Sequence, residues 1–189
     1  EAAAAANGQE PGDIKVQDVD GNGVITTDDR IIYSQRPDVT FGFNNTFNYK
    51  GFDLSVFLYA RLGQWIAYDY NTTYRINALE NGGNVDYWTP ENPTNAFPCP
   101  NKSKSYTQVT YYSTLKYEDG SFFKIRDITL GYTFKPELLK HLNLSKLRVY
   151  ATATNFFTFS KIDNYDPEQG GSISFPMTKQ LVFGLNVEF

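Results

Sequence analysis

The sequence predicts an all-β fold in which antiparallel strands form the C-terminal part of a large transmembrane β-barrel with long external loops. Five segments alternate apolar and polar residues with a period of two, the pattern of strands with one apolar and one polar face. The chain is 16% aromatic, yet its mean hydropathy is only −0.45, because alternation cancels in the average. No apolar run reaches the roughly 18 residues of a transmembrane helix.

Charge and side-chain chemistry argue against several other classes. The net charge is −4, from 17 basic and 21 acidic residues, so the chain lacks the basic character of nucleic-acid-binding proteins. The single cysteine, Cys99, and the single histidine, His141, lie in different kinds of segment. No catalytic triad, histidine cluster or phosphate-binding loop is visible in the sequence. We therefore expect no enzymatic activity and no nucleic-acid partner.

The chain is predicted to fall into three parts. Residues 1–10 begin with an alanine run and are interpreted as disordered, unassigned or vector-derived. Residues 11–37 are expected to form an external loop with an EF-hand-like calcium motif. Residues 38–189 are expected to form the C-terminal strands of the barrel.

Each predicted strand has one apolar face. In the segment Gln180–Phe189 the odd-numbered positions are Leu, Phe, Leu, Val and Phe, whereas the even-numbered positions are mostly small or polar. About ten residues suffice for a tilted strand to cross a bilayer, so the apolar face of this strand is expected to meet lipid. The same alternation predicts strands at Thr40–Tyr49, Phe52–Arg61, Ile125–Phe134 and Leu147–Asn155.

The connections between these strands sort by length. Lys50–Gly51 is a tight turn, and Lys135–Lys146 is a short connection with one helical turn around Pro136–Leu139. Leu62–Phe122 and Ser160–Lys179 are long, and a further strand is predicted within the first of them, at Gln108–Tyr117. Outer-membrane barrels have short periplasmic turns and long external loops. The alternation of short and long connections therefore places both long segments outside the cell.

Five strands cannot close a barrel by themselves. The smallest bacterial barrels have about eight strands, and an open sheet in lipid would leave unpaired backbone groups at its edges. We therefore expect the chain to pair with further strands of the same barrel.

The segment from Asp18 to Asp29 matches the spacing of an EF-hand calcium loop. Oxygen ligands at these positions suit a hard cation such as Ca²⁺, and Gly23 lies at the sharp turn. Asp29 stands where Glu is usual and reaches less far, so an Asx-rich turn that binds no metal remains an alternative. The predicted ligands are the side chains of Asp18, Asp20, Asn22 and Asp29 and the carbonyl of Val24.

Aromatic residues crowd the first long segment, where two interpretations remain open. They stack on sugar rings or peptide side chains, or they pack the loop onto its neighbours and onto the barrel rim. The second long segment carries Asp163, Asp166 and Glu168, which are expected to be solvated. The aromatic set comprises Trp65, Tyr68, Tyr70, Tyr74, Tyr87, Trp88, Phe97, Tyr106, Tyr111 and Tyr112.

Several motifs, in order along the chain, make it similar to the C-terminal end of the SusC/RagA family of TonB-dependent outer-membrane transporters. They cover nearly everything from residue 11 onward. The motifs are Gly12–Lys15, Arg30–Ile32, Pro37–Phe43, Tyr49–Leu54, Tyr87–Asn95, Ser121–Tyr132, Arg148–Tyr150, Thr154–Phe156 and Tyr165–Glu168.

The resemblance implies a barrel of about 22 strands with an internal plug. It also implies TonB-driven import of glycans or peptides across the outer membrane, and a SusD-like surface lipoprotein as partner. TonB would act through parts of the protein outside this chain, which would supply wall strands and external loops that meet lipid and substrate. The alternative is a secreted β-sandwich carbohydrate-binding module with a structural calcium site, in which the apolar faces would be buried between two sheets.

Overall fold

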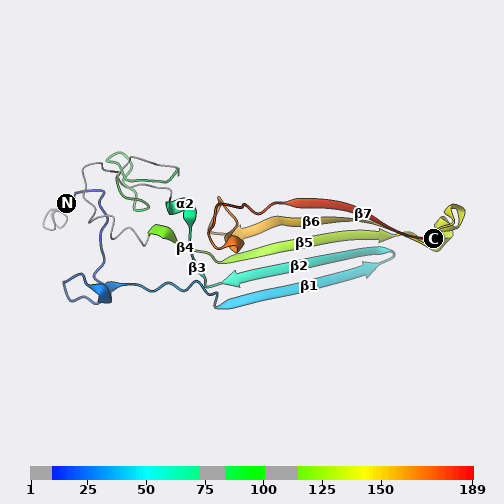
Figure 1. The fold of residues 1–189 in the computed structure, drawn as a ribbon, viewed down its shortest axis with the longest axis horizontal. Helices are drawn as coiled ribbons and strands as arrows, with labels where there is room; N and C mark the ends of the chain where they lie inside the picture. Colours follow the sequence, from blue (N-terminus) through cyan, green and yellow to red (C-terminus); the bar gives the residue numbers. More distant parts are fainter. Residues whose placement is uncertain (1–9, 73–83, 101–114) are drawn as a thin grey trace. The chain divides into compact units, whose positions relative to one another are not determined.

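The computed structural model describes residues 10–72, 84–100 and 115–189 (Figure 1). The chain falls into two compact units. The first consists of Glu1–Ser34, Ile66–Glu118 and Gly171–Ile173, and the second of Gln35–Trp65, Asp119–Gly170 and Ser174–Phe189. The predicted N-terminal segment, residues 1–10, lies outside the described residues except for Glu10. No helix within the described ranges is long and apolar enough to cross a membrane.

The second unit is built on a five-stranded antiparallel sheet, which confirms the predicted fold class (Figure 1). Its order, β1-β2-β5-β6-β7, follows the chain, so every strand pairs with the next strand of the same sheet along the chain. The strands are β1 (Val39–Tyr49), β2 (Phe52–Leu62), β5 (Phe122–Thr133), β6 (Lys146–Ser160) and β7 (Gln180–Glu188).

The register separates two faces, because residues directly opposite each other point to the same side of a sheet. On the face that we call the lipid face, Leu54 lies opposite Leu130, Leu130 opposite Ala151, and Ala151 opposite Phe183. Many of these side chains are exposed in the chain by itself, among them Leu130 and Phe183. An exposed apolar band of this kind fits a wall that meets hydrocarbon.

The opposite side, which we call the lumen face, is polar along most of its length. Ser55 lies opposite Thr129, and Thr129 lies opposite Thr152. The hydroxyls of Thr129 and Thr152 are 2.9 Å apart and form a hydrogen bond across the two strands. A polar face of this kind suits the water-filled interior of a barrel.

A β-bulge in β5 explains why the sequence pattern breaks there. The pairing of β2 with β5 shifts between Phe57 and Leu58, so that Asp127 and Ile125 lie opposite consecutive residues of β2. One extra residue in β5 reverses its alternation. Phe123 and Ile125 therefore share the lipid face with Ile128, and the strand begins at Phe122 rather than at the predicted Ile125.

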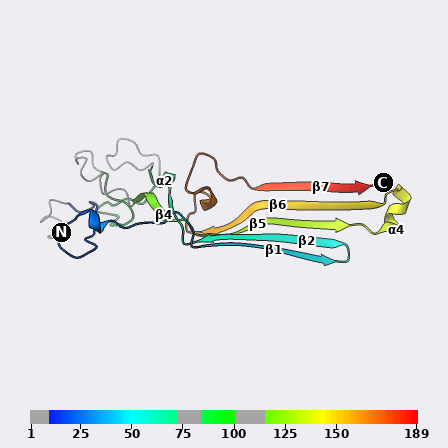
Figure 2. The same ribbon diagram turned by 60° about the horizontal axis from the view of Figure 1, so that its bottom comes forward.

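The short connections lie at one end of the sheet, as predicted (Figure 2). Lys50 and Gly51 have φ values of 49° and 90°, which a two-residue hairpin of type I′ requires. The connection from β5 to β6 contains helix α4 (Pro136–Leu139) and the 3₁₀ turn η3 (Lys140–Leu142). Pro136 begins α4, where its missing N–H costs nothing, and the last turn ends at Asn143 with φ 52°.

Where the structure describes them, the first unit and the long connections contain only short elements. These are η1 (Thr27–Asp29), α2 (Asp69–Thr72), and β3 (Trp65–Ala67) paired with β4 (Tyr117–Asp119); η4 (Pro167–Gln169) lies between β6 and β7. Most of the predicted strand Gln108–Tyr117 lies outside the described residues, as do Tyr74, Tyr106, Tyr111 and Tyr112. Among the other aromatic residues of this set, Tyr68 packs its ring 5.8 Å from that of Tyr70, which supports a packing role for these two.

Asp119, beside the long-loop end of the sheet, gives a pH-dependent prediction. Hydrogen bonds from Ser121 and Lys161 lower the pKa of its carboxyl from 3.8 to about 2. Because the pKa of Asp119 is lower in the folded than in the unfolded chain, its hydrogen bonds stabilise the fold above about pH 4. This stabilisation disappears as the pH falls from 3.8 towards 2. We expect hydrogen exchange of peptides spanning residues 119–122 to accelerate in that window beyond its intrinsic pH dependence. Asp119→Asn should remove the additional change, and an unaltered profile in this variant would contradict the assignment.

Candidate functional site

The predicted calcium loop brings three carboxylates together. Ligand oxygens of Asp18, Asp20 and Asp29 all lie within 4.8 Å of one another. The chain turns around Asp18, whose carboxylate accepts hydrogen bonds of 2.7 Å from the N–H groups of Gly21 and Gly23. Both glycines have positive φ, 76° and 84°, a backbone conformation that side chains disfavour. Three carboxylates this close together supply negative charge and oxygen atoms, which are the ligands that hard divalent cations prefer.

The side chain of Asp29 closes the loop by accepting hydrogen bonds from backbone N–H groups. Its carboxylate accepts N–H hydrogen bonds of 2.7 Å from Thr26 and from Val19, and Thr26 in turn caps η1. These N–H groups, that of Thr26 first, lower the pKa of Asp29. The carboxylate is therefore held in its anionic form, which is the form that binds a metal.

The remaining predicted ligands, Asn22 and Val24, form hydrogen bonds with other atoms of the loop. The Nδ2 of Asn22 donates to Asp20 at 2.7 Å, and its Oδ1 accepts from the N–H of Val24 at 2.7 Å. These contacts also describe an Asx-rich turn, so the loop geometry is compatible with both interpretations. The segment that enters the loop, residues 14–17, is not helical, unlike the entering segment of an EF-hand.

The second polar centre lies on the lumen face and was missed by sequence reasoning. Lys124 in β5 is fully buried, and its Nζ lies 2.7 Å from a carboxylate oxygen of Asp166 and 2.7 Å from one of Glu168. Arg126 lies 3.0 Å from the other oxygen of Glu168. A buried charge is stable only when it is paired, and here two carboxylates surround one ammonium. The expectation that Asp166 and Glu168 are solvated is therefore wrong, because they hold the β6–β7 segment against β5.

A third polar centre lies towards the short-turn end of the sheet. Arg148 in β6 reaches across β5 to Asp53 in β2, and its Nε donates to the carboxylate at 2.9 Å. The side chains cross over Gly131, which lies opposite Asp53. A Cβ at Gly131 would lie 2.5 Å from atoms of both Arg148 and Asp53. This glycine therefore allows an ion pair to bridge three strands.

Comparison with known proteins points to the same class of protein, TonB-dependent receptors, as the sequence and the fold do. No family model matches the chain. TonB-dependent receptor P3 of Formosa agariphila is 30% identical over 210 residues, which cover 99% of this chain and 20% of the relative. TonB-dependent receptor SusC of Bacteroides thetaiotaomicron is 31% identical over 180 residues, which cover 91% of this chain and 17% of the relative. The chain thus spans about a fifth of the length of these relatives.

Solved structures agree with these relatives. A chain of the RagAB peptide transporter matches with a TM-score of 0.68 and 27% identity, over 85% of this chain and 18% of that one. A chain of the RagAB peptide importer in the closed-closed state matches with a TM-score of 0.68 over 91% of this chain. The named relatives are receptors and transporters, whereas the β-sandwich alternative finds no support among them. The chain matches the C-terminal part of SusC/RagA-like TonB-dependent receptors, which are outer-membrane β-barrel proteins.

Proposed function

We propose that this chain forms the C-terminal wall of a barrel that imports glycans or peptides across the outer membrane with energy supplied through TonB. One observation carries the proposal. The five-stranded sheet has one lipid face and one polar face, and nearly all of the chain matches TonB-dependent receptors. The chain itself supplies strands, lumen lining and the long connections, which face the outside. The remaining strands of the same barrel pair with its open edges.

The proposed partners follow from the same likeness. The RagAB and SusC relatives support a SusD-like surface lipoprotein at the external side and TonB acting through parts of the protein outside this chain. Lipid covers the apolar face. The glycan and peptide alternatives both remain, since the relatives include SusC and a peptide transporter.

The experiment uses the full-length protein in its native cell. It should fractionate with outer membranes and require detergent, and deletion of its gene should abolish growth on one glycan or peptide source. Inactivating TonB should give the same growth defect. A protein that is soluble without detergent would contradict the proposal, as would import that is unaffected by loss of TonB.

We also propose that the Asp18–Asp29 loop binds Ca²⁺ as a structural site. The three neighbouring carboxylates and the anionic state of Asp29 support this assignment. By the connection lengths the loop is external, where a weak site of the ~10⁻⁴–10⁻³ M class would be filled. No catalytic or switching role follows from it.

Removing two of these carboxylates should remove the metal. We expect the full-length Asp18→Ala/Asp20→Ala variant to contain one calcium ion fewer per chain than wild type, measured by mass spectrometry of metals after dialysis against calcium. Asp28→Ala is the matched control, since Asp28 lies in the same loop but outside the carboxylate cluster. Equal calcium content in wild type and the double variant would show that the loop is an empty Asx-rich turn.

A further inference from the structure

A row of aromatic side chains crosses the lipid face just before the short-turn end of the sheet. Tyr49 lies opposite Phe52, and Phe52 lies opposite Tyr132. The ring centroids of Phe52 and Tyr132 are 4.6 Å apart, and those of Tyr132 and Phe134 are 5.0 Å apart. Aromatic girdles of outer-membrane barrels lie where the hydrocarbon meets the headgroups. This row therefore sets the depth at which the sheet leaves the hydrocarbon.

The connection from β5 to β6 begins at this boundary, at the short-turn end of the sheet (Figure 2). Lys135 directly follows Phe134, and α4 begins at the next residue, Pro136. A helix of four residues is about 6 Å long, similar to the roughly 5–8 Å of headgroup layer on each side of a bilayer. The connection is therefore expected to lie at the level of the lipid headgroups.

Two leucines of this connection are exposed. Leu138 is 60% exposed and Leu142 is 62% exposed. Leu139 between them is buried, and α4 packs against β6. One leucine therefore fixes the connection to the sheet, while its two neighbours present apolar surface at the boundary of the membrane. Apolar side chains at this level can insert between the acyl chains of lipids.

Positive charge accompanies these leucines. Residues 135–146 include three lysines and one acidic residue, although the chain as a whole has a net charge of −4. Lys146 forms an ion pair of 2.9 Å with Glu188. Lys135 and Lys140 are exposed and form no ion pair with any residue that the structure describes. Lysines at the membrane surface attract anionic headgroups.

We infer that the connection between β5 and β6 binds anionic phospholipids of the periplasmic leaflet of the outer membrane. Leu138 and Leu142 insert among the acyl chains, and Lys135 and Lys140 contact the phosphates. The inference rests on the proposed function, which places the short turns on the periplasmic side, where the leaflet consists of phospholipids. Lipid is the occupant that fits, because this surface continues the aromatic row of the lipid face and its free charges are positive.

The first experiment measures lipid binding to the full-length transporter in detergent by native mass spectrometry. The probes are phosphatidylglycerol, which is anionic, and phosphatidylcholine, which has no net charge. Lys135→Gln/Lys140→Gln should weaken binding of the first phosphatidylglycerol by about 5-fold for each lysine. Binding of phosphatidylcholine should stay unchanged in this variant.

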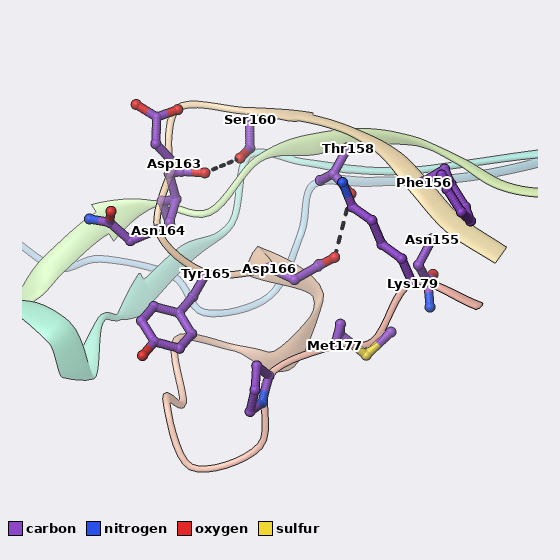
Figure 3. Close-up of a pocket in the computed structure, with 12 residues that line it drawn as sticks. Asn155, Phe156, Thr158, Ser160, Asp163, Asn164, Tyr165, Asp166, Met177 and Lys179 are labelled. Atoms are coloured by element: carbon purple, nitrogen blue, oxygen red, sulfur yellow. Dashed lines mark hydrogen bonds between the residues drawn. The ribbon is translucent and has the colours of Figure 1, made fainter. Parts of the chain in front are cut away.

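A matched control removes the same charge at the long-loop end of the sheet. Lys161 directly follows β6, and its side chain is 77% exposed. Lys179 directly precedes β7 and lines a cavity of about 320 Å³ beside β6 (Figure 3). Lys161→Gln/Lys179→Gln should bind phosphatidylglycerol as wild type does. Equal losses in the two double variants would show a general effect of net charge and would overturn the inference.

The second experiment locates Leu142 relative to the bilayer. A nitroxide label is attached at Leu142→Cys in full-length protein without other cysteines, Cys99→Ser included, in vesicles of phosphatidylethanolamine and phosphatidylglycerol. The label should be accessible to oxygen and protected from a water-soluble nickel complex. Leu130→Cys on the lipid face is the reference for lipid, and Lys161→Cys is the reference for water.

Unchanged phosphatidylglycerol binding in Lys135→Gln/Lys140→Gln would overturn the inference, as would a label at Leu142 that the nickel complex reaches. A label that neither reagent reaches would show that another part of the protein covers these leucines, and would overturn it as well. In each case a label at Leu130 that reports lipid leaves the proposed function intact. A label at Leu130 that reports water would overturn the proposed function itself.

Discussion

Replacing Gly131 with alanine is expected to impair assembly of the barrel wall. A Cβ at this position would lie 2.5 Å from Arg148 and from Asp53, closer than real Cβ contacts allow. The atoms it would meet are the ends of both side chains, so the ion pair would have to separate, at a cost of about 1–3 kcal/mol for its charge-assisted hydrogen bonds. The measurement is the urea midpoint of the full-length protein in detergent, together with the amount of folded protein in the outer membrane.

The chain offers a matched control and a rescue for this prediction. Gly42 also lies in a strand, but a Cβ there would meet the ring of Phe57 at 3.6 Å, an ordinary contact, so Gly42→Ala should be nearly neutral. If the ion pair is the obstacle, Gly131→Ala should cost little when Asp53 and Arg148 are both alanine. A full effect of Gly131→Ala in that background would point to the backbone of β5 and not to the pair.

The strands and their faces are predictable from the sequence because period-two alternation is a local property. Prediction fails where that property is interrupted. The bulge in β5 reverses the alternation of apolar and polar residues between Ile125 and Ile128. The predicted strand therefore starts at Ile125, three residues after the observed start at Phe122. In β6 the positive φ of Asn155 interrupts the alternation, so the predicted strand ends at Asn155. The observed strand continues beyond it to Ser160. Neither feature leaves a clear signal in composition.

The Asp18–Asp29 loop and the Lys124 centre differ in how far they can be predicted from the sequence, for the same reason. The contacts of the Asp18–Asp29 loop join residues at most about ten positions apart, so their spacing is visible in the sequence. Lys124 and Asp166 are 42 positions apart and meet only because the β6–β7 segment folds back onto β5. The available signal was weaker: Lys124 and Arg126 are basic residues at the start of a predicted strand, where a charge facing the interior needs a partner.

The second large effect is expected for Lys124→Met, which should release the β6–β7 segment from β5. Methionine has a similar length and suits burial, but it leaves the carboxylate of Asp166 without its ammonium partner and that of Glu168 with Arg126 alone. Their side chains are only 13% and 12% exposed, so losing the shared ammonium should cost about 3–5 kcal/mol. The segment should move out into water because hydration then replaces the ion pairs.

Limited proteolysis and hydrogen exchange of residues 161–179 in the full-length protein measure this release. Lys146→Met is the control, since Lys146 pairs with Glu188 on an exposed surface, where an ion pair contributes only about 0–1 kcal/mol. Adding Asp166→Asn to Lys124→Met should restore part of the protection, because the unpaired charge is then gone while Glu168 keeps its contact with Arg126. A Lys124→Met segment as protected as wild type would show that Pro167 and the hydrogen bonds around η4 hold it without the charges.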